Sequence, residues 1–254
     1  MTTVIELEAA AMSNTGQVRK SNEDSFGTFE PEEPSELAEK GALYIVADGM
    51  GGHRGGEVAS NLAVETIRAH YYSSTDQDPS TALVDAFNAA NRAIHEKAVS
   101  DNTLFGMGTT CTAMVVRGEK AYFAHVGDSR AYLFRKGKLQ QVTEDHSLVG
   151  EMLRSGMISR EDARVHPQRN VITRSLGVQQ AIQPYIPPVP YDIEDGDVFL
   201  LCSDGLTALV IEDDIVSALE LYNSHEACRR LIDLANQRGG IDNITVQIIE
   251  VRKR

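Results

Sequence analysis

Residues 42–57 read ALYIVADGMGGHRGGE, and the interpretation of the whole sequence starts from this stretch. A short apolar run at 43–47 has the length of a buried strand and ends at one carboxylate, Asp48. Glycines follow, which allow positive φ angles and let the backbone lie close to an ion or ligand. On its own, the stretch fits a strand that simply stops at a turn as well as a carboxylate held rigidly at a sheet edge.

Three more carboxylates stand at the tips of apolar strands, namely Asp128, Asp204 and Asp242. If these tips converge on Asp48, four acids meet without a nearby lysine, and like charges raise one another's pKa. Divalent cations would balance that charge, and an all-oxygen ligand set without cysteine favours Mg²⁺ or Mn²⁺ over Zn²⁺. The other interpretation is that the four residues are unrelated turn aspartates.

Apolar runs and turn residues predict strands at residues 4–12, 25–29, 43–47, 110–116, 121–126, 131–134, 198–203 and 244–251. Helical periodicity predicts two helices between 57 and 98, with Ser80 capping the second, and two more at 215–222 and 227–238. Short connections between strands indicate antiparallel pairing. Two pairs of helices set between blocks of strands indicate helical layers outside paired sheets, so we expect an α+β fold.

Three segments interrupt this regular pattern. Residues 30–40, EPEEPSELAEK, are acidic and hold two prolines, which predicts a solvated connector. The proline-rich segment 182–193 can form only an edge strand or a connector. Residues 146–182 are polar and irregular apart from two short helices, which is typical of a functional loop beside a site.

The composition is that of a globular protein, with 42% hydrophobic residues, 24% charged residues and a formal net charge of −13. This acidity argues against nucleic-acid or anionic-membrane binding, and it fits both cation binding and simple solubility. Three cysteines form no CxxC pair, which disfavours disulfides and a zinc site and favours a reducing cytoplasm. No apolar run reaches the roughly 18 residues of a membrane span, and we expect no signal peptide.

Two common glycine-loop motifs do not fit the sequence. A P-loop requires Gly-Lys followed by Ser or Thr, and this triplet does not occur. A dinucleotide fingerprint requires GxGxxG, but Gly49-Met50-Gly51 is followed by Arg54 at the position of the third glycine. Nucleotide binding through either loop is therefore excluded.

Six motifs occur in one order along almost the whole chain: RKSNED at 19–24, ADGMGGH at 47–53, GTT at 108–110, GDSR at 127–130, CSDGL at 202–206 and GIDNIT at 240–245. In this set the sequence resembles the metal-dependent serine/threonine protein phosphatases, the type 2C family, in its bacterial branch. The resemblance implies a four-layer αββα sandwich of two mainly antiparallel sheets flanked by pairs of helices. It also implies that residues 1–254 form one catalytic domain, with segment 146–182 as the variable flap beside the active site.

The resemblance implies a centre of two Mg²⁺ or Mn²⁺ ions, with a third, weaker metal site in bacterial members. Asp48 would bridge the two ions. The Gly49 carbonyl would bind one of them, and Asp204 and Asp242 the other. Asp128, with Asp204, resembles the third site. Activated water at such a centre attacks phosphorus in line, so the expected reaction is hydrolysis of phosphoserine and phosphothreonine monoesters.

Other motif residues resemble those that hold substrate or support the centre. Arg19 matches the arginine that grips the substrate phosphate, because a planar guanidinium meets phosphate bidentately. Glu23 and Asp24 match acids that hold metal-bound waters or orient that arginine, and Asn243 follows a metal aspartate. His53 stands three positions beyond the place where the animal branch has a histidine proposed as general acid, so a catalytic role and a structural role both remain open.

Further residues are expected to support the structure. His125 and His146 are expected to be structural, Ser129 and Ser203 to orient neighbouring carboxylates, and Arg130 to pair with a carboxylate near the sheet end. The expected partners are phosphoprotein substrates and the pathway of a cognate Ser/Thr kinase, with no nucleic acid, no membrane segment and a monomeric, cytoplasmic chain. A catalytically dead regulator of the same fold and a small-molecule phosphatase are the alternatives. The four aspartates argue against the first, and the sequence does not exclude the second.

Overall fold

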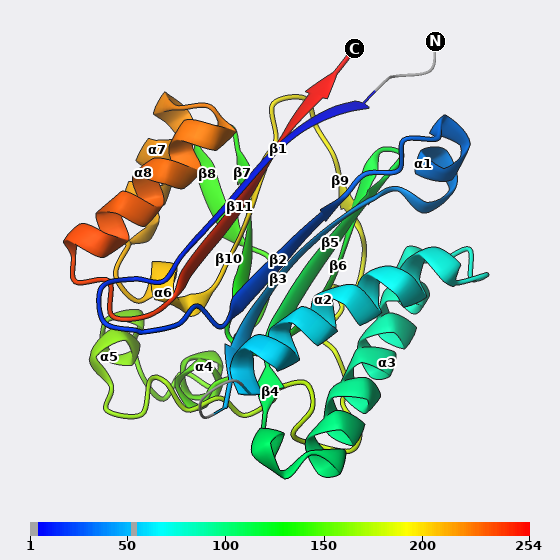
Figure 1. The fold of residues 1–254 in the computed structure, drawn as a ribbon. Coiled ribbons are helices and arrows are strands. Elements are labelled where there is room, and N and C mark those ends of the chain that lie inside the picture. Colours follow the sequence, from blue (N-terminus) through cyan, green and yellow to red (C-terminus); the bar gives the residue numbers. More distant parts are fainter. Residues whose placement is uncertain (1–4, 52–54) are drawn as a thin grey trace.

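The computed structural model describes residues 5–51 and 55–254. Two antiparallel sheets lie face to face between two layers of helices (Figure 1). The five-stranded sheet has the order β1-β11-β10-β7-β8 and consists of β1 (Ile5–Asn14), β7 (Arg130–Arg135), β8 (Lys138–Gln141), β10 (Val198–Cys202) and β11 (Ile244–Lys253). The six-stranded sheet has the order β2-β3-β5-β6-β9, with β4 paired to β3, and consists of β2 (Asp24–Phe29), β3 (Ala42–Met50), β4 (Gly108–Thr109), β5 (Cys111–Arg117), β6 (Lys120–Val126) and β9 (Tyr191–Asp192).

Each sheet is covered on its outer face by one pair of long helices. Helices α2 (Gly55–Ser73) and α3 (Pro79–Ser100) pack on the six-stranded sheet, and α7 (Glu212–Leu221) and α8 (Ser224–Gln237) pack on the five-stranded sheet. The short helical segments are α1 (Pro34–Lys40), η1 (Asn102–Leu104), α4 (Leu148–Arg154), α5 (Arg160–Val165) and α6 (Asp204–Thr207). This is the αββα arrangement that the sequence predicted. No helix within the described ranges is long and apolar enough to cross a membrane.

Strand β3 is buried on both faces, which explains its continuous apolar sequence. Leu43 and Ile45 point to the cluster formed with α2 and α3, whereas Tyr44 and Val46 point to the cluster between the sheets. Full burial of each such side chain contributes about 1.5–3 kcal/mol relative to exposure. The two faces together hold β3 at the centre of the sandwich.

Strand β11 carries polar residues on the face that points between the sheets. Thr245 Oγ1 donates to Asp24 Oδ2 over 2.7 Å, and Gln247 Nε2 donates to the carbonyl of Gly27 over 3.1 Å. Both acceptors lie on β2 of the other sheet. Because hydrogen bonds are directional and apolar contacts are not, these bonds fix β11 relative to β2.

The start of α3 differs from the prediction. Asp78, not Ser80, is the N-cap, and its carboxylate accepts from the backbone N–H groups of Ser80 and Thr81. Pro79 occupies the first helical turn, where its missing N–H has no partner to lose. An aspartate directly before a proline was therefore the stronger start signal.

The acidic segment 30–40 also differs in part from the prediction. It contains the helix α1, which has no buried residue and begins with a proline in its first turn. The end of this helix is tied to α2, because Tyr71 donates its hydroxyl to the carbonyl of Lys40 and Lys40 Nζ donates to the carbonyl of Ser74. The segment is solvated as expected, but it is helical rather than irregular.

Two further strands were not predicted. Strand β8 pairs with β7 through a two-residue turn in which Lys136 and Gly137 have φ angles of 51° and 76°, as a type I′ hairpin requires. Strand β4 has only two residues and pairs with Gly49 and Met50, so β3 continues past Asp48 instead of ending before it. Both strands are too short and too polar for a hydrophobic pattern to reveal.

Candidate metal centre

Asp48 lies near the end of β3, where the backbone is held on both sides. Its carbonyl accepts from the hydroxyl of Thr109 and from the backbone N–H of Thr110, both over 2.8 Å. Its own N–H donates to the Thr110 hydroxyl over 3.1 Å. Across the other edge of β3, Asp48 stands opposite Asp24 of β2. The backbone is therefore fixed while the carboxyl group remains available.

Gly49 occupies a position that admits no side chain. A Cβ atom there would collide with the carbonyl oxygens of Gly56 and Glu23. The Gly49 N–H donates to the Glu23 carbonyl over 3.2 Å. Glycine is required here because the start of α2 and the loop before β2 both approach the backbone of β3.

Asp204 and Asp242 lie on the other sheet, at the end of β10 and before β11. Asp204 follows the end of β10, as predicted, and it is also the first residue of the short helix α6. Asp242 Oδ2 accepts from Arg19 Nη2 over 2.7 Å, and its Oδ1 accepts from the backbone N–H of Asn243. The Arg19 side chain is 55% exposed, so it reaches the site from solvent.

Two buried carboxylates each keep one oxygen without a hydrogen-bond partner among the described residues, Asp24 Oδ1 and Asp128 Oδ1. The second oxygen of Asp24 accepts from Ser203 Oγ over 2.8 Å and from Thr245 Oγ1. Buried polar atoms normally find a partner, so an unpaired one calls for a ligand or water. One unpaired oxygen thus belongs to a strand-tip aspartate, Asp128, and the other to Asp24, which stands opposite Asp48.

The carboxyl groups act on one another electrostatically. Burial, followed by the charges of neighbouring aspartates, raises the pKa of Asp48 and of Asp128 well above the ordinary value. Burial raises the pKa of Asp24 to about 7, although two hydroxyl donors oppose the shift. Burial and the charge of Asp242 raise the pKa of Asp204, and a hydrogen bond with Asp48 only partly opposes this rise. These acids cannot all be ionised near neutral pH without added positive charge.

This donor set fits hard divalent cations. Among the described residues, no three His, Cys, Asp or Glu side chains are yet arranged tightly enough to enclose an ion. The acids nevertheless raise one another's pKa, and two of their buried oxygens are unpaired. Carboxylate and carbonyl oxygens are the ligands that Mg²⁺ and Mn²⁺ prefer. A cation would draw these carboxylates together when it binds, and the unpaired oxygens and raised pKa values are where its charge would be balanced.

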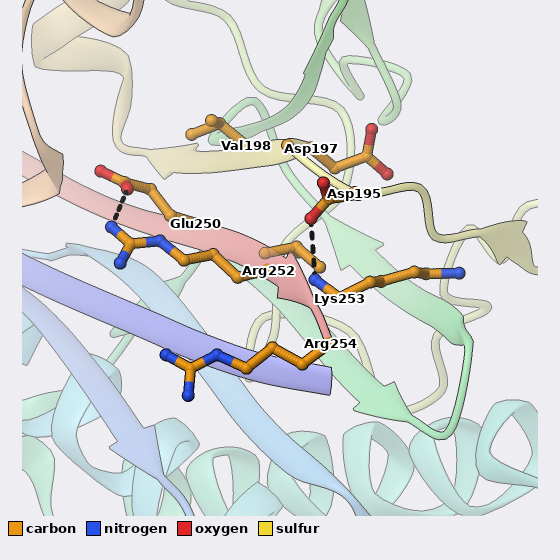
Figure 2. A pocket seen from close by; sticks show the side chains of 9 residues that line it. Asp195, Asp197, Val198, Glu250, Arg252, Lys253 and Arg254 are labelled. Atoms are coloured by element: carbon orange, nitrogen blue, oxygen red, sulfur yellow. Dashed lines mark hydrogen bonds and ion pairs between the residues drawn. The ribbon is translucent and has the colours of Figure 1, made fainter. Parts of the chain in front are cut away.

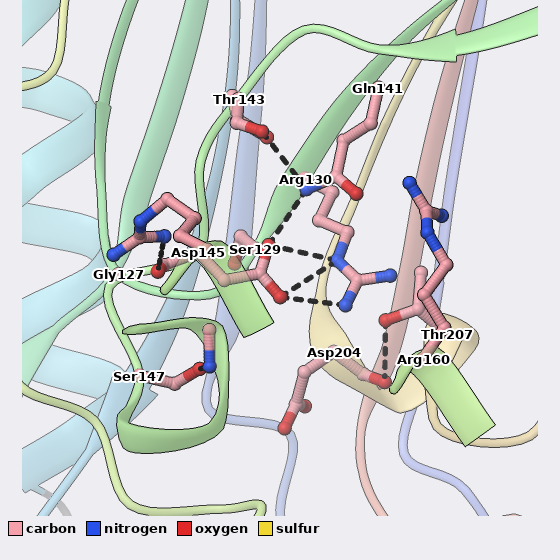
Figure 3. A network of polar contacts seen from close by, with 12 residues as sticks. Gly127, Ser129, Arg130, Gln141, Thr143, Asp145, Ser147, Arg160, Asp204 and Thr207 are labelled. Atoms are coloured by element: carbon pink, nitrogen blue, oxygen red, sulfur yellow. Dashed lines mark hydrogen bonds and ion pairs between the residues drawn. The ribbon is translucent and has the colours of Figure 1, made fainter. Parts of the chain in front are cut away.

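Arg130 pairs with a carboxylate near the sheet end, as predicted (Figure 3). Its Nε and Nη2 atoms donate to both oxygens of Asp145, over 3.0 and 2.6 Å. Ser203 also behaves as predicted, because it donates to Asp24. The prediction for Ser129 was wrong. Its hydroxyl lies 2.7 Å from that of Thr110 and does not contact a carboxylate.

His125 and His146 are buried and stack at 5.1 Å between ring centroids, which supports the structural role predicted for them. The Nδ1 atom of His146 accepts from the backbone N–H of Gly127, and its own backbone N–H donates to the Gly127 carbonyl. Burial lowers the pKa of His125 to about 4 and that of His146 to about 3, so both rings are neutral. The sequence did not reveal that His146 links the flap to the residue before Asp128.

Two further residues of the predicted site are Asn243 and His53. Asn243 is buried, and its Oδ1 accepts from the Glu23 N–H over 2.8 Å while its Nδ2 donates to the carbonyls of Thr15 and Ser21. It thus fixes the loop that carries Arg19. His53 falls within residues 52–54, outside the described residues.

A cavity lies elsewhere in the described chain. It measures about 410 Å³ and is lined by residues 195–198 and 250–254, beside the C-terminal end of β11 (Figure 2). Its polar groups are already engaged: the backbone N–H of Lys253 donates to Asp195 Oδ1, and Arg252 pairs with Glu250 and Glu8. The aspartates at the strand tips lie at the other end of the sandwich, near β4 and α6 (Figure 1).

Comparison with known proteins identifies the family. The family model described as Protein phosphatase 2C matches residues 9–244. The chain belongs to the protein phosphatase 2C family. A phosphatase 2C relative, serine/threonine phosphatase stp of Listeria welshimeri, is 40% identical over 249 residues, covering 96% of each chain. Serine/threonine protein phosphatase PstP of Mycobacterium tuberculosis is 39% identical over 249 residues, and the chain covers 45% of its length.

Solved phosphatase 2C structures share the fold. The catalytic domain of PstP in complex with two manganese ions matches with a TM-score of 0.84 and 36% identity, covering 98% of this chain and all of that chain. Together with the family match and the named relatives, this makes the protein a metal-dependent protein-serine/threonine phosphatase that uses Mg²⁺ or Mn²⁺. Its substrates are phosphoproteins.

Proposed function

We propose that residues 1–254 form a single catalytic domain whose two Mg²⁺ or Mn²⁺ ions are held by Asp48, Asp204, Asp242 and the Gly49 carbonyl. Asp128 contributes to a third site. The observation that supports these assignments most directly is the group of carboxyls with raised pKa values, two of whose buried oxygens lack partners. When bound, the ions activate water as the nucleophile and offset charge on the phosphoryl group.

Arg19 binds the phosphate of the substrate in this proposal. Its guanidinium has five N–H donors, and the bond to Asp242 uses one of them. The exposed side chain can therefore grip a phosphate bidentately while Asp242 orients it. Because Asn243 holds the loop on both sides of Arg19, the arginine approaches the site from a fixed backbone.

In this proposal, Asp24 and Glu23 assist the reaction from positions next to the metal ligands and Arg19. Asp24 Oδ1 is unpaired and accepts a hydrogen bond or a proton from water, since the pKa of Asp24 of about 7 allows exchange near neutral pH. Burial raises the pKa of Glu23, which stands beside Arg19. His53 is proposed as the acid that protonates the leaving oxygen.

In the cell, the proposed role is to reverse the action of a cognate Ser/Thr kinase on cytoplasmic phosphoproteins, with the enzyme acting as a monomer. The family relationship and the exposed phosphate-binding arginine support this role.

The test is hydrolysis of a phosphothreonine peptide with Mn²⁺, with and without chelator, by the wild type and by Arg19→Lys. We expect no turnover in chelator, and a loss in kcat/KM of about 10- to 100-fold for Arg19→Lys because a lysine cannot form the bidentate contact. Arg68→Lys is the control, since Arg68 lies on the surface of α2 and pairs with Glu65. Full turnover in chelator would refute the metal assignment, and wild-type kinetics for Arg19→Lys would refute the role of Arg19.

A further inference from the structure

The flap, residues 146–182, has a positive net charge, whereas the rest of the protein has a negative one. Residues 146–182 hold five arginines and three carboxylates, whereas the other 217 residues hold 19 basic and 34 acidic side chains. No aspartate or glutamate occurs between Asp162 and Asp192, a stretch that contains Arg164, Arg169 and Arg174. A positive segment in a protein of net charge −13 creates a local field that attracts negative groups.

These three arginines are exposed, and their guanidinium groups make no hydrogen bond or ion pair with any other described residue. The two other arginines of the flap behave differently. Arg154 donates to the carbonyl of Asp145, and Arg160 pairs with Glu212 of α7. The flap thus contains two arginines that hold its structure and three that are free to bind a ligand.

Backbone hydrogen bonds tie the neighbours of Arg174 to the strand ends that carry the carboxylates. Thr173 donates its N–H to the carbonyl of His146, and Leu176 exchanges two hydrogen bonds with Thr109. Thr109 in turn donates its hydroxyl to the carbonyl of Asp48. Arg174 therefore lies between two residues tied to the strand ends that carry the carboxylates. After burial and His125, the charge of Arg174 is the next cause of the low pKa of His146.

The other two arginines lie farther out along the same segment. Arg164 belongs to α5. Arg169 lies in the loop between α5 and the backbone pairing of Leu148 with Val171. Two exposed apolar residues, Val165 (77% exposed) and Val171 (44%), stand close to them in sequence. A bound peptide that runs away from the phosphorylated residue would meet alternating basic and apolar side chains.

We propose that the flap selects phosphoproteins with acidic residues beside the phosphorylated serine or threonine, through Arg164, Arg169 and Arg174. This inference rests on the site proposed above. The phosphate itself is bound by Arg19 and the ions, so it does not require three further arginines spread over eleven residues. Aspartate or glutamate side chains on the substrate supply the missing partners, and the acidic remainder of the enzyme surface disfavours their binding elsewhere.

The test compares two phosphothreonine peptides in Mn²⁺ at low ionic strength, one flanked by glutamates and one by glutamines. We expect the wild-type enzyme to prefer the acidic peptide by about tenfold in kcat/KM, mostly through KM, and to lose this preference in high salt. Arg164→Gln/Arg169→Gln/Arg174→Gln should bring the ratio close to one. Arg92→Gln, a change of one exposed arginine on α3, should leave the ratio unchanged.

A charge-reversed variant excludes misfolding as an explanation. Arg164→Glu/Arg169→Glu should prefer a lysine-flanked peptide over the acidic one, which a damaged enzyme would not do. Equal turnover of the acidic and neutral peptides by the wild type, or a preference that survives the glutamine variant, would overturn the proposal. Failure of the wild type to hydrolyse even the neutral peptide would instead contradict the proposed function.

Discussion

The strand-tip carboxylates and the flap lie at the same end of the sandwich, but they are built in opposite ways. The carboxylates are buried or half-buried, and their strand ends are fixed by short backbone contacts such as those of Asp48 with Thr109 and Thr110. The flap is exposed and basic, and three of its arginines have no partner within the described chain. A site that binds metal ions needs carboxylates held in fixed positions, although they repel one another. A surface that binds varied peptides instead needs side chains that are free to pair with the ligand. The next four predictions test this contrast.

The largest effect is expected from Asp48→Asn. Removing the charge of this proposed metal ligand should reduce phosphatase activity by at least about a thousandfold, equivalent to roughly 4 kcal/mol of transition-state stabilisation. In chelator the same variant should melt a few degrees higher than the wild type, because one buried repulsive charge is gone. Thermal melts and peptide turnover would measure both.

Asp85→Asn, an exposed change on α3, is the matched control and should alter neither property. A lower melting temperature for Asp48→Asn in chelator would show that the carboxylates do not repel one another in the metal-free chain.

The second prediction concerns pH. The pKa of Asp24 is about 7 in the folded metal-free chain and about 3.9 in an unfolded one, so folding binds a proton. This carboxyl therefore destabilises the chain increasingly as pH rises from about 4 to about 7. Ions that bind the ionised carboxylates offset this loss, so the rise in Tm caused by Mn²⁺ should be several degrees larger at pH 8 than at pH 5.5.

The two buried histidines also destabilise the folded chain at low pH, because their folded pKa values lie below that of an unfolded histidine. Their contribution is the same with and without Mn²⁺ and cancels in the difference. An effect of Mn²⁺ on Tm that does not vary with pH would contradict the second prediction.

The third prediction concerns His146, which joins the two regions. His146→Leu leaves the buried N–H of Gly127 without an acceptor, which should cost about 1–3 kcal/mol in the free energy of unfolding. His146→Asn places an amide oxygen near the former Nδ1 position and should recover most of this loss. Urea denaturation measures both, with the exposed His70→Leu as control. Equal losses in the two variants would mean that ring stacking, not the hydrogen bond, matters at this position.

The smallest effect is expected within the flap. Arg160 and Glu212 are 67% and 40% exposed in their side chains, so Arg160→Gln should cost at most about 1 kcal/mol. Arg135→Gln provides the contrast, because its partner Asp197 is fully buried and would lose its counter-charge at a cost of about 3–5 kcal/mol. Similar losses in both variants would mean that the flap is held as firmly as the sandwich.

Much of the fold followed from local patterns. Apolar runs located the long strands because both faces of β3 and β10 are buried, and glycines beside the aspartates located the strand tips. The pattern failed where backbone pairing alone creates structure, as in β4 and β8. It also failed at Asp78, where an aspartate before a proline caps the helix more effectively than the serine after it.

The candidate site was predictable in its residue types and not in its contacts. Aspartates at strand tips indicated a cation site, but nothing local indicated that Thr245 and Ser203 would share one oxygen of Asp24 from the opposite sheet. The link between His146 and Gly127 spans 19 residues and depends on how the flap folds back. Such contacts arise from the tertiary arrangement and leave no periodic signal in the sequence.

The polar face of β11 has one further consequence. Asp48 belongs to one sheet and Asp204 and Asp242 to the other, so the spacing between them depends on how far the two sheets are displaced along each other. Apolar side chains would tolerate a small sliding movement, but the bonds from Thr245 and Gln247 to β2 permit a single alignment. The hydrogen bonds inside the sandwich thus set the spacing of the aspartates at its end. Enlarging or trimming an apolar side chain should change stability more than catalysis, whereas Thr245→Val should disturb catalysis while leaving the core intact.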